Sequence, residues 1–376
     1  MAVQRTLIMD VDGFAIRRFR SPLVAELLAR NCEVTVAAPG FSADDRCALE
    51  RTGATTRTYR LERTGLNPWS DLHTKRSIRD MMHEVNPDAV LCRAAKAVAY
   101  GLPEAASAGI RTRIGFMTGL GSMFNPESTR QRFTAAIGRR LIMKGLRQAT
   151  QVWVMNRDNR QTLTELDPGL GAILDMDSSG VDTRLFQPAP LPPTPTFCFI
   201  GRLLPAKGAT DFIAMAEHLR SNGSTHRFIV AGEPDRHRDS ITAEQVQSLH
   251  EQGVIDYRGF VEDTGSLIRE STALILPSRH EGRSRSLMEA LACGRPVITS
   301  DAPGCHDAID HGIEGLVVPR GDVEGLCRAV RSLGEAPEEV QRMGDSARKL
   351  AVARYDQEKV ARRNADAMLG IGAPDS

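Results

Sequence analysis

The stretch Gln187-Pro188-Ala189-Pro190-Leu191-Pro192-Pro193-Thr194-Pro195 divides the sequence into two similar halves. It has five prolines in nine residues, and proline suits neither a helix interior nor a central strand. On each side, short apolar runs alternate with stretches of helical periodicity, the pattern of parallel βαβ units. We therefore predict an α/β protein with an N-terminal domain over residues 1–187, a linker over 188–195, a C-terminal domain over 196–355, and a C-terminal helix over 356–376 that packs back on the first domain.

Apolar runs bounded by glycine, proline or serine mark the expected strands. In the first half they cover residues 6–9, 33–38 and 89–92, with a helix over 22–30. In the second half they cover residues 196–200, 228–231, 273–276, 297–299 and 316–318. Doubly wound sheets bind ligands at the carboxyl ends of their strands, so we expect the ligand in the crevice between two such domains.

Composition excludes several classes of function. The 376 residues include 48 basic and 47 acidic side chains, so no global field favours nucleic acid. Seven cysteines without a C-x-x-C pair argue against a zinc site or a disulfide framework, and they suit a reducing cytoplasm. No apolar run approaches the roughly 18 to 20 residues of a membrane span, and no signal peptide opens the chain. We expect a cytoplasmic protein whose membrane contact is at most peripheral.

The most informative motif is His280-Glu281-Gly282-Arg283-Ser284-Arg285-Ser286-Leu287-Met288-Glu289-Ala290-Leu291-Ala292-Cys293-Gly294-Arg295-Pro296. A turn of glycine and serine that opens a helix presents free backbone N–H groups and suits a phosphate. Glu281 and Glu289 could accept hydrogen bonds from sugar and ribose hydroxyls. The alternative is structural, since Ser286-x-x-Glu289 also fits a capping box with Ser286 as the N-cap.

A second motif, Phe199-Ile200-Gly201-Arg202-Leu203-Leu204-Pro205-Ala206-Lys207-Gly208, follows the first strand after the proline-rich stretch. Arg202 and Lys207 flank a turn that leads into a helix starting near Thr210. Both cations could converge on a diphosphate and stabilise the charge that grows on it as a leaving group. The alternative is a pair of solvated basic residues on a loop.

The two motifs together resemble family 4 of the glycosyltransferases. Members carry G-R-L-x-x-x-K-G after the interdomain linker and E-G-x-x-x-x-x-x-E-A-x-A-x-G-x-P-V some eighty residues later, and both stand here in that order. Three further stretches are similar to the subgroup that builds bacterial surface polysaccharides and glycans: residues 118–124, 179–188 and 302–307. The resemblance implies a GT-B fold, in which two Rossmann-like domains face each other across a cleft, and transfer of a hexose or N-acetylhexosamine from a nucleoside diphosphate sugar, UDP above all.

The resemblance also implies roles for individual residues. Arg202 and Lys207 would hold the donor diphosphate, Glu281 would contact the transferred sugar, and Glu289 would bind the ribose. Similar enzymes retain the anomeric configuration, need no metal or other cofactor, and let the leaving phosphate accept the acceptor's proton, so no side-chain base is expected. The catalytic set is thus Glu281, Arg202 and Lys207, and the remaining donor-binding candidates are Gly201, Phe260, Val261, Gly282, Arg283, Ser284, Ser286, Leu287 and Glu289.

Two departures from the family pattern stand out. Similar enzymes usually have a small or apolar residue and then proline after E-G, whereas this chain has Arg283-Ser284, which we expect to add a cation beside the sugar. The family's glycine pair in the first N-terminal loop is replaced by Asp12-Gly13-Phe14.

The acceptor is expected on the N-terminal half, as a glycan or a polyprenol diphosphate. Residues 130–147 carry six basic side chains and no acidic one, with apolar residues interleaved. Such a helix could rest on the anionic inner face of the plasma membrane, or be solvated with its apolar side packed on its own domain. The acceptor-binding candidates are Asp12, Gly13, Lys96, Thr118, Gly119 and Gly121.

Other functions remain open from the sequence. The same fold could serve a soluble natural-product acceptor, or a sugar-nucleotide epimerase. The motif Asp10-Val11-Asp12 resembles the opening motif of haloacid dehalogenase-type phosphatases, with Asp10 as nucleophile and Asp12 as general acid. A Rossmann dehydrogenase is disfavoured because no G-x-G-x-x-G follows either first strand.

Overall fold

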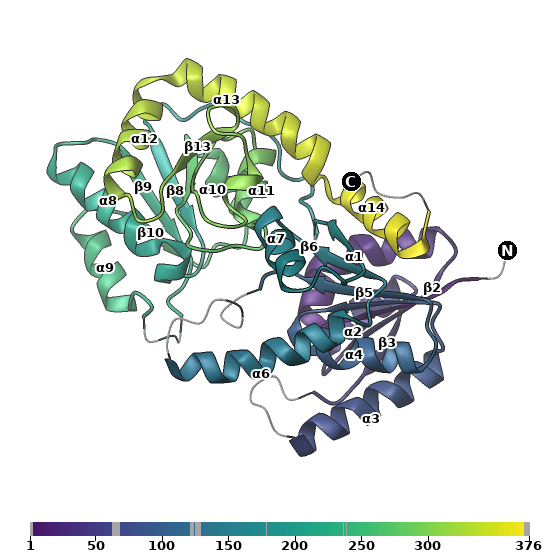
Figure 1. The fold of residues 1–376 in the computed structure, drawn as a ribbon. Helices are drawn as coiled ribbons and strands as arrows, with labels where there is room; N and C mark the ends of the chain where they lie inside the picture. The colour runs from purple at the N-terminus through teal and green to yellow at the C-terminus, as the bar shows by residue number, and fades with distance from the viewer. Residues whose placement is uncertain are drawn as a thin grey trace. The chain divides into compact units, whose positions relative to one another are not determined.

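The computed structural model describes residues 3–61, 68–120, 124, 129–177, 179–235, 237 and 239–371. The chain forms two compact units (Figure 1). Unit 1 comprises Met1–Ser179 with Glu358–Ser376, and unit 2 comprises Gly180–Gln357. Each unit is built around its own parallel sheet.

Unit 1 contains a seven-stranded sheet of order β3-β2-β1-β4-β5-β6-β7, in which every pair is parallel. The strand order reverses between β1 and β4, which makes this the switch point of the sheet. Its strands are β1 (Arg5–Met9), β2 (Glu33–Ala38), β3 (Thr55–Thr58), β4 (Ala89–Arg93), β5 (Thr112–Met117), β6 (Gln151–Val154) and β7 (Ala172–Asp175). Its helices are α1 (Gly13–Ala29), α2 (Ala43–Arg51), α3 (Pro68–Val85), α4 (Ala95–Ser107), α6 (Thr129–Leu146), α7 (Arg157–Leu166) and α14 (Gln357–Leu369).

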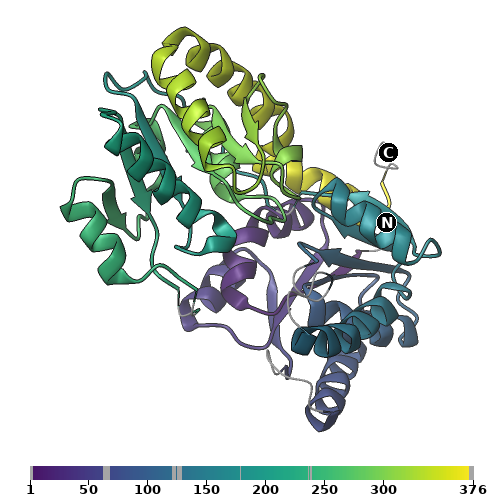
Figure 2. The ribbon, with the colours of Figure 1, turned by 60° about the vertical axis from the view of Figure 1, so that its left-hand side comes forward.

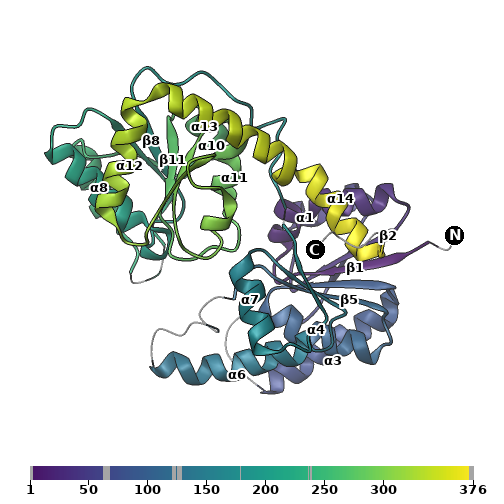
Figure 3. The ribbon, with the colours of Figure 1, turned by 45° about the horizontal axis from the view of Figure 1, so that its top comes forward.

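Helices cover both faces of this sheet (Figures 2 and 3). On one face, α3, α4 and α6 contribute apolar side chains such as Ile78, Leu102 and Leu146. On the other face, α1 and α14 bury Ile16 and Met368 in a second cluster. Burial on both faces explains why the strands read as apolar runs rather than as alternating patterns.

The first helix is longer than the sequence indicates. We expected a helix over residues 22–30, but α1 begins at Gly13 and Pro22 lies inside it. Asp12 is its N-cap, and its carboxylate accepts a hydrogen bond from the Phe14 N–H at 3.0 Å. Burial of one side of the helix in the core outweighs the single hydrogen bond that the proline removes.

Helix α6 is the basic segment expected at residues 130–147. Ile142 and Leu146 are buried against the core of unit 1, and a Cβ at Gly145 would overlap the carbonyl of Val98 on α4. Much of the apolar side of α6 is therefore packed on its own unit. Its exposed face carries Arg139, Arg140, Lys144, Arg147 and the partly exposed Ile137.

Unit 2 contains a six-stranded parallel sheet of order β10-β9-β8-β11-β12-β13. The order reverses between β8 and β11, the switch point of this unit. Its strands are β8 (Thr196–Ile200), β9 (Arg227–Ala231), β10 (Asp256–Gly259), β11 (Ala273–Leu276), β12 (Val297–Ser300) and β13 (Gly315–Val318). Its helical segments are η1 (Pro205–Lys207), α8 (Ala209–Ser221), α9 (Ala243–Glu251), α10 (Thr264–Arg269), α11 (Arg285–Ala292), η2 (His306–Ala308), α12 (Val323–Glu335), α13 (Pro337–Leu350) and η3 (Ala351–Tyr355).

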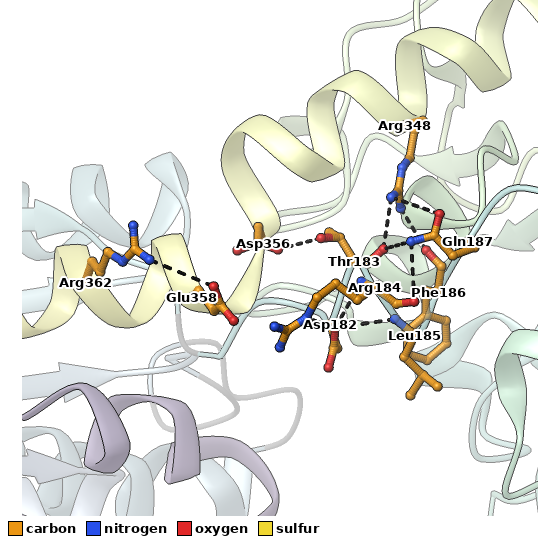
Figure 4. Close-up of polar contacts among 10 residues, drawn as sticks. All are labelled: Asp182, Thr183, Arg184, Leu185, Phe186, Gln187, Arg348, Asp356, Glu358 and Arg362. Carbon is orange, nitrogen blue, oxygen red and sulfur yellow. Dashed lines mark hydrogen bonds and ion pairs between the residues drawn. The ribbon is translucent and has the colours of Figure 1, made fainter. Parts of the chain in front are cut away.

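The boundary between the units lies before Gly180, ahead of the expected linker. Arg348 of α13 donates hydrogen bonds to the carbonyls of Thr183 and Phe186, and the Thr183 hydroxyl donates to Asp356 (Figure 4). Residues 180–187 are therefore fixed in unit 2, not in the first domain. The proline-rich stretch also lies in unit 2, where Arg295 donates to the carbonyls of Ala189 and Pro190 at 2.8 and 2.7 Å.

The chain returns to unit 1 after Gln357. In α14, Asn364 donates to the carbonyl of Asp177 at 3.0 Å, and Arg30 of α1 pairs with Asp366 at 2.5 Å. Ala365 and Met368 are fully buried in the core that α1 also lines. Unit 1 is thus assembled from two separate pieces of the sequence.

Candidate functional site

The candidate donor residues lie after β8, β10 and β11 of unit 2, on the loops that follow these strands and in helix α11. Arg202 and Lys207 come directly after β8, and Glu281 follows β11. Since β8 and β11 are the neighbours at which the strand order reverses, their loops diverge from the same edge of the sheet. Residues about seventy positions apart in sequence therefore meet at the place where doubly wound sheets bind ligands.

Lys207 and Glu281 are in direct contact. The ammonium nitrogen Nζ of Lys207 donates to both carboxylate oxygens of Glu281, at 2.6 and 2.8 Å. The Ser278 hydroxyl donates to Oε1 of Glu281 at 3.0 Å, and the backbone N–H of Glu281 donates to the carbonyl of Pro303. Glu281 is buried while Lys207 is partly exposed. The carboxylate is thus held in one orientation by a lysine, a serine and its own backbone.

Glycines bring the surrounding loops this close. Gly304 has a φ of 74°, and a Cβ there would overlap the carbonyl oxygens of Glu281 and Gly282. Gly208 has a φ of 75°, and a Cβ there would overlap the carbonyl of Pro277. Only glycine meets both conditions without strain. The loops after β11 and β12, and the turn after Lys207, are therefore packed backbone against backbone.

Arg202 lies at the edge of the same group and has a carboxylate partner of its own. Its guanidinium nitrogen Nη1 donates to Asp235 at 2.8 Å, and most of its side chain is exposed. The Arg202 hydrogen bond, with that of the His237 N–H, lowers the pKa of Asp235. A flexible, exposed arginine can turn to an arriving anion, provided that it leaves this aspartate.

Glu289 is not part of a capping box. Helix α11 begins at Arg285 with Ser284 as its N-cap, and no side chain caps it, so Ser286 lies inside the helix. The Glu289 carboxylate instead accepts hydrogen bonds from the Thr264 hydroxyl at 2.9 Å and from Arg285 at 2.8 Å. The capping-box interpretation is wrong because the helix starts two residues earlier than it requires, with Ser284 and not Ser286 as the N-cap.

Arg283 does not extend beside Glu281. Its side chain is buried and donates to the carbonyl of Asp307 at 3.1 Å. Its guanidinium lies 5.6 Å from the centre of the Tyr355 ring. The expectation of an added cation beside the sugar is therefore wrong: a buried guanidinium is stable only beside a carboxylate, carbonyls or an aromatic face, and these lie on the inner side of the loop.

The remaining donor candidates differ in what they can offer a ligand. Leu287 is fully buried, so only its backbone could reach a ligand. Phe260 is 73% exposed after β10, whereas Val261 packs on the core. A Cβ at Gly232 would overlap the carbonyl of Gly201, which brings the loops after β8 and β9 together. The hydroxyls of Ser284 and Ser286 are 3.1 Å apart at the start of α11.

A thiol lies beneath the donor residues. Cys305 is fully buried, and burial together with the nearby Glu281 carboxylate raises the pKa of its thiol to about 12. It is therefore a neutral thiol at physiological pH, which removes it as a nucleophile.

The acceptor candidates gather at the carboxyl edge of the unit 1 sheet. Lys96 is in the first turn of α4, whose N-cap, Ala94, has a φ of 69° and makes no side-chain capping bond. Thr118 and Gly119 follow β5, the strand next to β4. Gly121 lies outside the described residues.

Asp12 and Gly13 have structural roles in this unit. Asp12 caps α1, and a Cβ at Gly13 would lie 2.5 Å from the Phe41 ring and 2.7 Å from the Gly40 carbonyl. Asp10 is fully buried and accepts two hydrogen bonds from Arg93, at 2.7 and 3.0 Å. A carboxylate held in this way is a poor nucleophile, which counts against the phosphatase alternative.

The described residues include neither a metal-binding cluster nor a membrane-spanning helix. Among them, no group of three or more His, Cys, Asp or Glu residues could hold a metal ion. In the same part of the chain, no helix combines the length and apolarity needed to cross a bilayer.

Comparison with known proteins identifies the class of enzyme. Residues 194–335, in unit 2, match the family model of the glycosyl transferases group 1. The chain is a glycosyltransferase. The crystal structure of HepE from Anabaena in complex with UDP matches this glycosyltransferase with a TM-score of 0.79 at 16% identity, over 98% of this chain and 100% of that one. A sucrose-phosphate synthase from Thermosynechococcus elongatus matches with a TM-score of 0.78. These two structural matches confirm the GT-B fold.

Two sequence relatives are named for the transfer of different sugars. An enzyme of Campylobacter jejuni named N,N'-diacetylbacillosaminyl-diphospho-undecaprenol alpha-1,3-N-acetylgalactosaminyltransferase is 25% identical over 365 residues, 93% of this glycosyltransferase and 94% of the relative. The alpha-D-kanosaminyltransferase of Streptomyces kanamyceticus is 28% identical over 183 residues, 48% of this chain and 47% of the relative.

Sequence reasoning missed the residues that hold the donor candidates in place. Asp235, Thr264 and Asp307 each lie on a different segment from the side chain they contact, whereas Ser278 lies on the same loop as Glu281. A polar residue between a strand and the next helix is the one signal that such partners give, and it is common to most α/β loops.

Proposed function

We propose that this glycosyltransferase is a member of family 4 that moves a hexose or N-acetylhexosamine from a UDP-sugar to a glycan or polyprenol-diphosphate acceptor, with retention and without a metal ion. The observation that carries the proposal is the contact of Lys207 with Glu281 beside the β8/β11 switch point. One group can neutralise a phosphate and the other can bind a sugar hydroxyl.

The proposed reaction breaks the bond between the anomeric carbon and the diphosphate. Lys207 and Arg202 stabilise the negative charge that develops on the departing UDP. The acceptor oxygen forms the new bond on the same face of the sugar, and its proton passes to the leaving phosphate oxygen. Glu281 accepts hydrogen bonds from donor sugar hydroxyls and orients the ring. Metal independence follows from this arrangement, because two protein cations supply the charge that a metal would bring.

The acceptor proposal is supported by charge on unit 1. Lys96 stands at the N-terminal end of α4 without an acidic residue in the first turn. A lysine and the positive end of a helix both attract an anion. A diphosphate on the acceptor would supply that anion, as in the acceptor named for the Campylobacter jejuni relative.

The proposed location is the cytoplasmic face of the membrane, reached through the exposed basic face of α6. Arg139, Arg140 and Lys144 are all exposed on this helix, which has no acidic residue. Each basic residue near an anionic surface adds about 1 kcal/mol of attraction. Binding to vesicles of phosphatidylglycerol, but not of phosphatidylcholine, and its loss in a variant with Arg139, Arg140 and Lys144 all changed to Gln would support this location.

A soluble natural-product acceptor is the second candidate. It is favoured by a relative of Streptomyces fradiae named 2-deoxystreptamine N-acetyl-D-glucosaminyltransferase, which is 31% identical over 39% of this chain. An assay that offers either an aminocyclitol or a polyprenol-diphosphate sugar as acceptor separates the two.

The donor is tested by thermal shift with UDP-, GDP-, ADP- and TDP-sugars, because a ligand that binds the native state raises its melting temperature. We expect the largest rise with a UDP-sugar. Incubation of that donor with acceptor should give an α-linked product from an α-donor by proton NMR. Formation of an epimer from donor alone would establish an epimerase, and an inverted linkage would contradict retention.

A further inference from the structure

The short segment Glu281–Ser284, here called the donor loop, is held from its inner side by its own arginine. Of the Arg283 side chain, 3% is exposed. Its Nη1 atom donates to the carbonyl of Asp307 at 3.1 Å and lies 3.7 Å from an Asp307 carboxylate oxygen. The guanidinium also faces the Tyr355 ring at 5.6 Å. Arg283 therefore joins the donor loop to two other segments of unit 2.

Those two segments are themselves tied together. The Tyr355 hydroxyl donates to the carbonyl of Ala308 at 2.8 Å. Arg354 lies 5.2 Å from the same ring and donates to the Asp307 carbonyl at 3.4 Å. Tyr355 also accepts, at its carbonyl, the backbone N–H of Val181. Arg283 is thus anchored in a fixed framework near the start and the end of unit 2.

Glu281 and Arg283 are turned to opposite sides of the donor loop. Glu281 faces Lys207 and Ser278, whereas Arg283 faces Asp307 and Tyr355. Only Gly282 separates them, so a shift of one α-carbon is passed to the other with little slack. The loop has no room to yield underneath, because Gly304 already contacts the carbonyls of Glu281 and Gly282.

An arginine is a costly residue to bury for packing alone. A buried guanidinium loses its hydration, and an apolar side chain of similar volume would fill the same space at lower cost. The next residue, Ser284, has a φ of −72° and makes no side-chain capping bond to α11. The contacts of the Arg283 side chain therefore restrain this part of the donor loop.

We propose that Arg283 is a positioning residue that sets the place of the Glu281 carboxylate, and so the selectivity of the enzyme between donor sugars that differ in hydroxyl configuration. This rests on the proposed function, in which Glu281 binds sugar hydroxyls. Arg283 itself has Asp307 and Tyr355 of unit 2 as partners. It acts through the donor loop.

The test compares Arg283→Met with Arg283→Lys and with a matched control, Arg295→Met. Arg295 is as deeply buried in unit 2, but its acceptors are the carbonyls of Ala189, Pro190 and Arg269, outside the donor loop. For each folded variant, kcat and KM are measured with the preferred UDP-sugar and with its C4 epimer, and the Kd of UDP is measured by calorimetry. Melting temperatures show how far each variant is destabilised.

In Arg283→Met we expect kcat to fall at least about 30-fold while the Kd of UDP changes less than about threefold, because the diphosphate and base contacts stay in place. The preference between the epimers should fall about tenfold, since a misplaced carboxylate no longer distinguishes an axial from an equatorial hydroxyl. Arg283→Lys keeps the positive charge near Asp307, so it should recover part of the lost kcat and part of the lost epimer preference. Arg295→Met should lose stability without losing selectivity.

The proposal is overturned if Arg283→Met keeps the wild-type epimer preference, or if its kcat and its UDP affinity fall together. Glu281→Gln separates this failure from that of the proposed function. If Glu281→Gln turns over at the wild-type rate, the proposed function is wrong, and this inference is wrong with it. If Glu281→Gln is inactive but Arg283→Met keeps the wild-type selectivity, only the inference about Arg283 is wrong.

Discussion

Lys207 donates hydrogen bonds from one nitrogen to both carboxylate oxygens of Glu281, at 2.6 and 2.8 Å. The two side chains come from the loops after β8 and β11, and each restrains the other. A ligand phosphate would draw Lys207 toward itself and leave Glu281 free to accept sugar hydroxyls. The pair is therefore suited to bind the two ends of a sugar–diphosphate bond.

Removal of either partner should have a distinct effect. Glu281→Gln keeps hydrogen-bonding capacity but loses charge, so we expect kcat to fall at least about 100-fold with little change in stability. Lys207→Ala leaves a buried carboxylate without its cation and should also lower stability, by on the order of 1–3 kcal/mol. Urea unfolding and steady-state kinetics measure both. Glu324→Gln, at an exposed site of unit 2, is the control and should change neither.

The Arg202–Asp235 contact should oppose donor binding. Because Asp235 holds the guanidinium at 2.8 Å, the diphosphate must compete for it. We expect Asp235→Asn to bind UDP about threefold more tightly, and Arg202→Met to bind it at least about tenfold more weakly. Calorimetric titration with UDP measures both constants. Weaker binding by Asp235→Asn would mean that Asp235 orients Arg202 for the donor rather than competing with it.

Two glycines allow a matched test of loop packing. Gly304 and Gly312 have φ values of 74° and 81°, but a Cβ meets the carbonyls of Glu281 and Gly282 only at Gly304, while space is open at Gly312. Alanine at either position should cost about 1–2 kcal/mol in backbone strain. Only Gly304→Ala should also displace the donor loop and abolish most turnover. Equal activity of the two variants would show that this loop tolerates displacement.

Thiol labelling should be confined to one cysteine at neutral pH. Six of the seven cysteines are buried and Cys47 is exposed. Burial raises the pKa of Cys198 to about 12 and of Cys293 to about 11, so these groups stay protonated in the native state. Iodoacetamide at pH 8 should modify Cys47 alone, as read by mass spectrometry.

The raised pKa values of these buried thiols should make the free energy of unfolding depend on pH. Their pKa values are raised in the folded state, so their contribution is fully present below the unfolded thiol pKa, about 8.5. It is lost progressively as the pH rises above that value, because the unfolded chain ionises first. A melting temperature that stays constant between pH 8 and 10 would contradict this.

Chelation should leave the transferase active. Among the described residues, no acidic or histidine cluster could hold a metal ion, and Lys207 and Arg202 can carry the charge of the leaving group. We expect kcat after dialysis against EDTA to stay within about twofold of the untreated enzyme. Loss of activity that added Mg²⁺ or Mn²⁺ restores would show that a cation is required after all.

The fold was largely predictable because its strands are buried on both faces. The runs expected at residues 196–200 and 273–276 are β8 and β11, and the family motifs placed Arg202, Lys207 and Glu281 after them. The strand β10 was missed because Asp256–Gly259 is polar and lies at the edge of its sheet. Local periodicity carries no signal for such a strand.

The errors at the site have a common cause. The inward orientation of Arg283 depends on Asp307 and Tyr355. One of the hydrogen-bond donors to Glu289 is Thr264. These contacts join residues that are far apart in the sequence. The unit boundary was also placed too late because Arg348 and Asp356 fix residues 180–187 from a distance. A single sequence shows which residues are polar, but not which of them meet.

The split construction of unit 1 has a consequence for synthesis. A ribosome completes every strand of unit 1, and then all of unit 2, before it makes most of α14. Until then, the apolar surface that Ala365 and Met368 cover is exposed to water on the nascent chain. Unit 1 therefore reaches its final packing only after unit 2 has left the ribosome, and newly made chains should pass through a state in which this patch is open to aggregation.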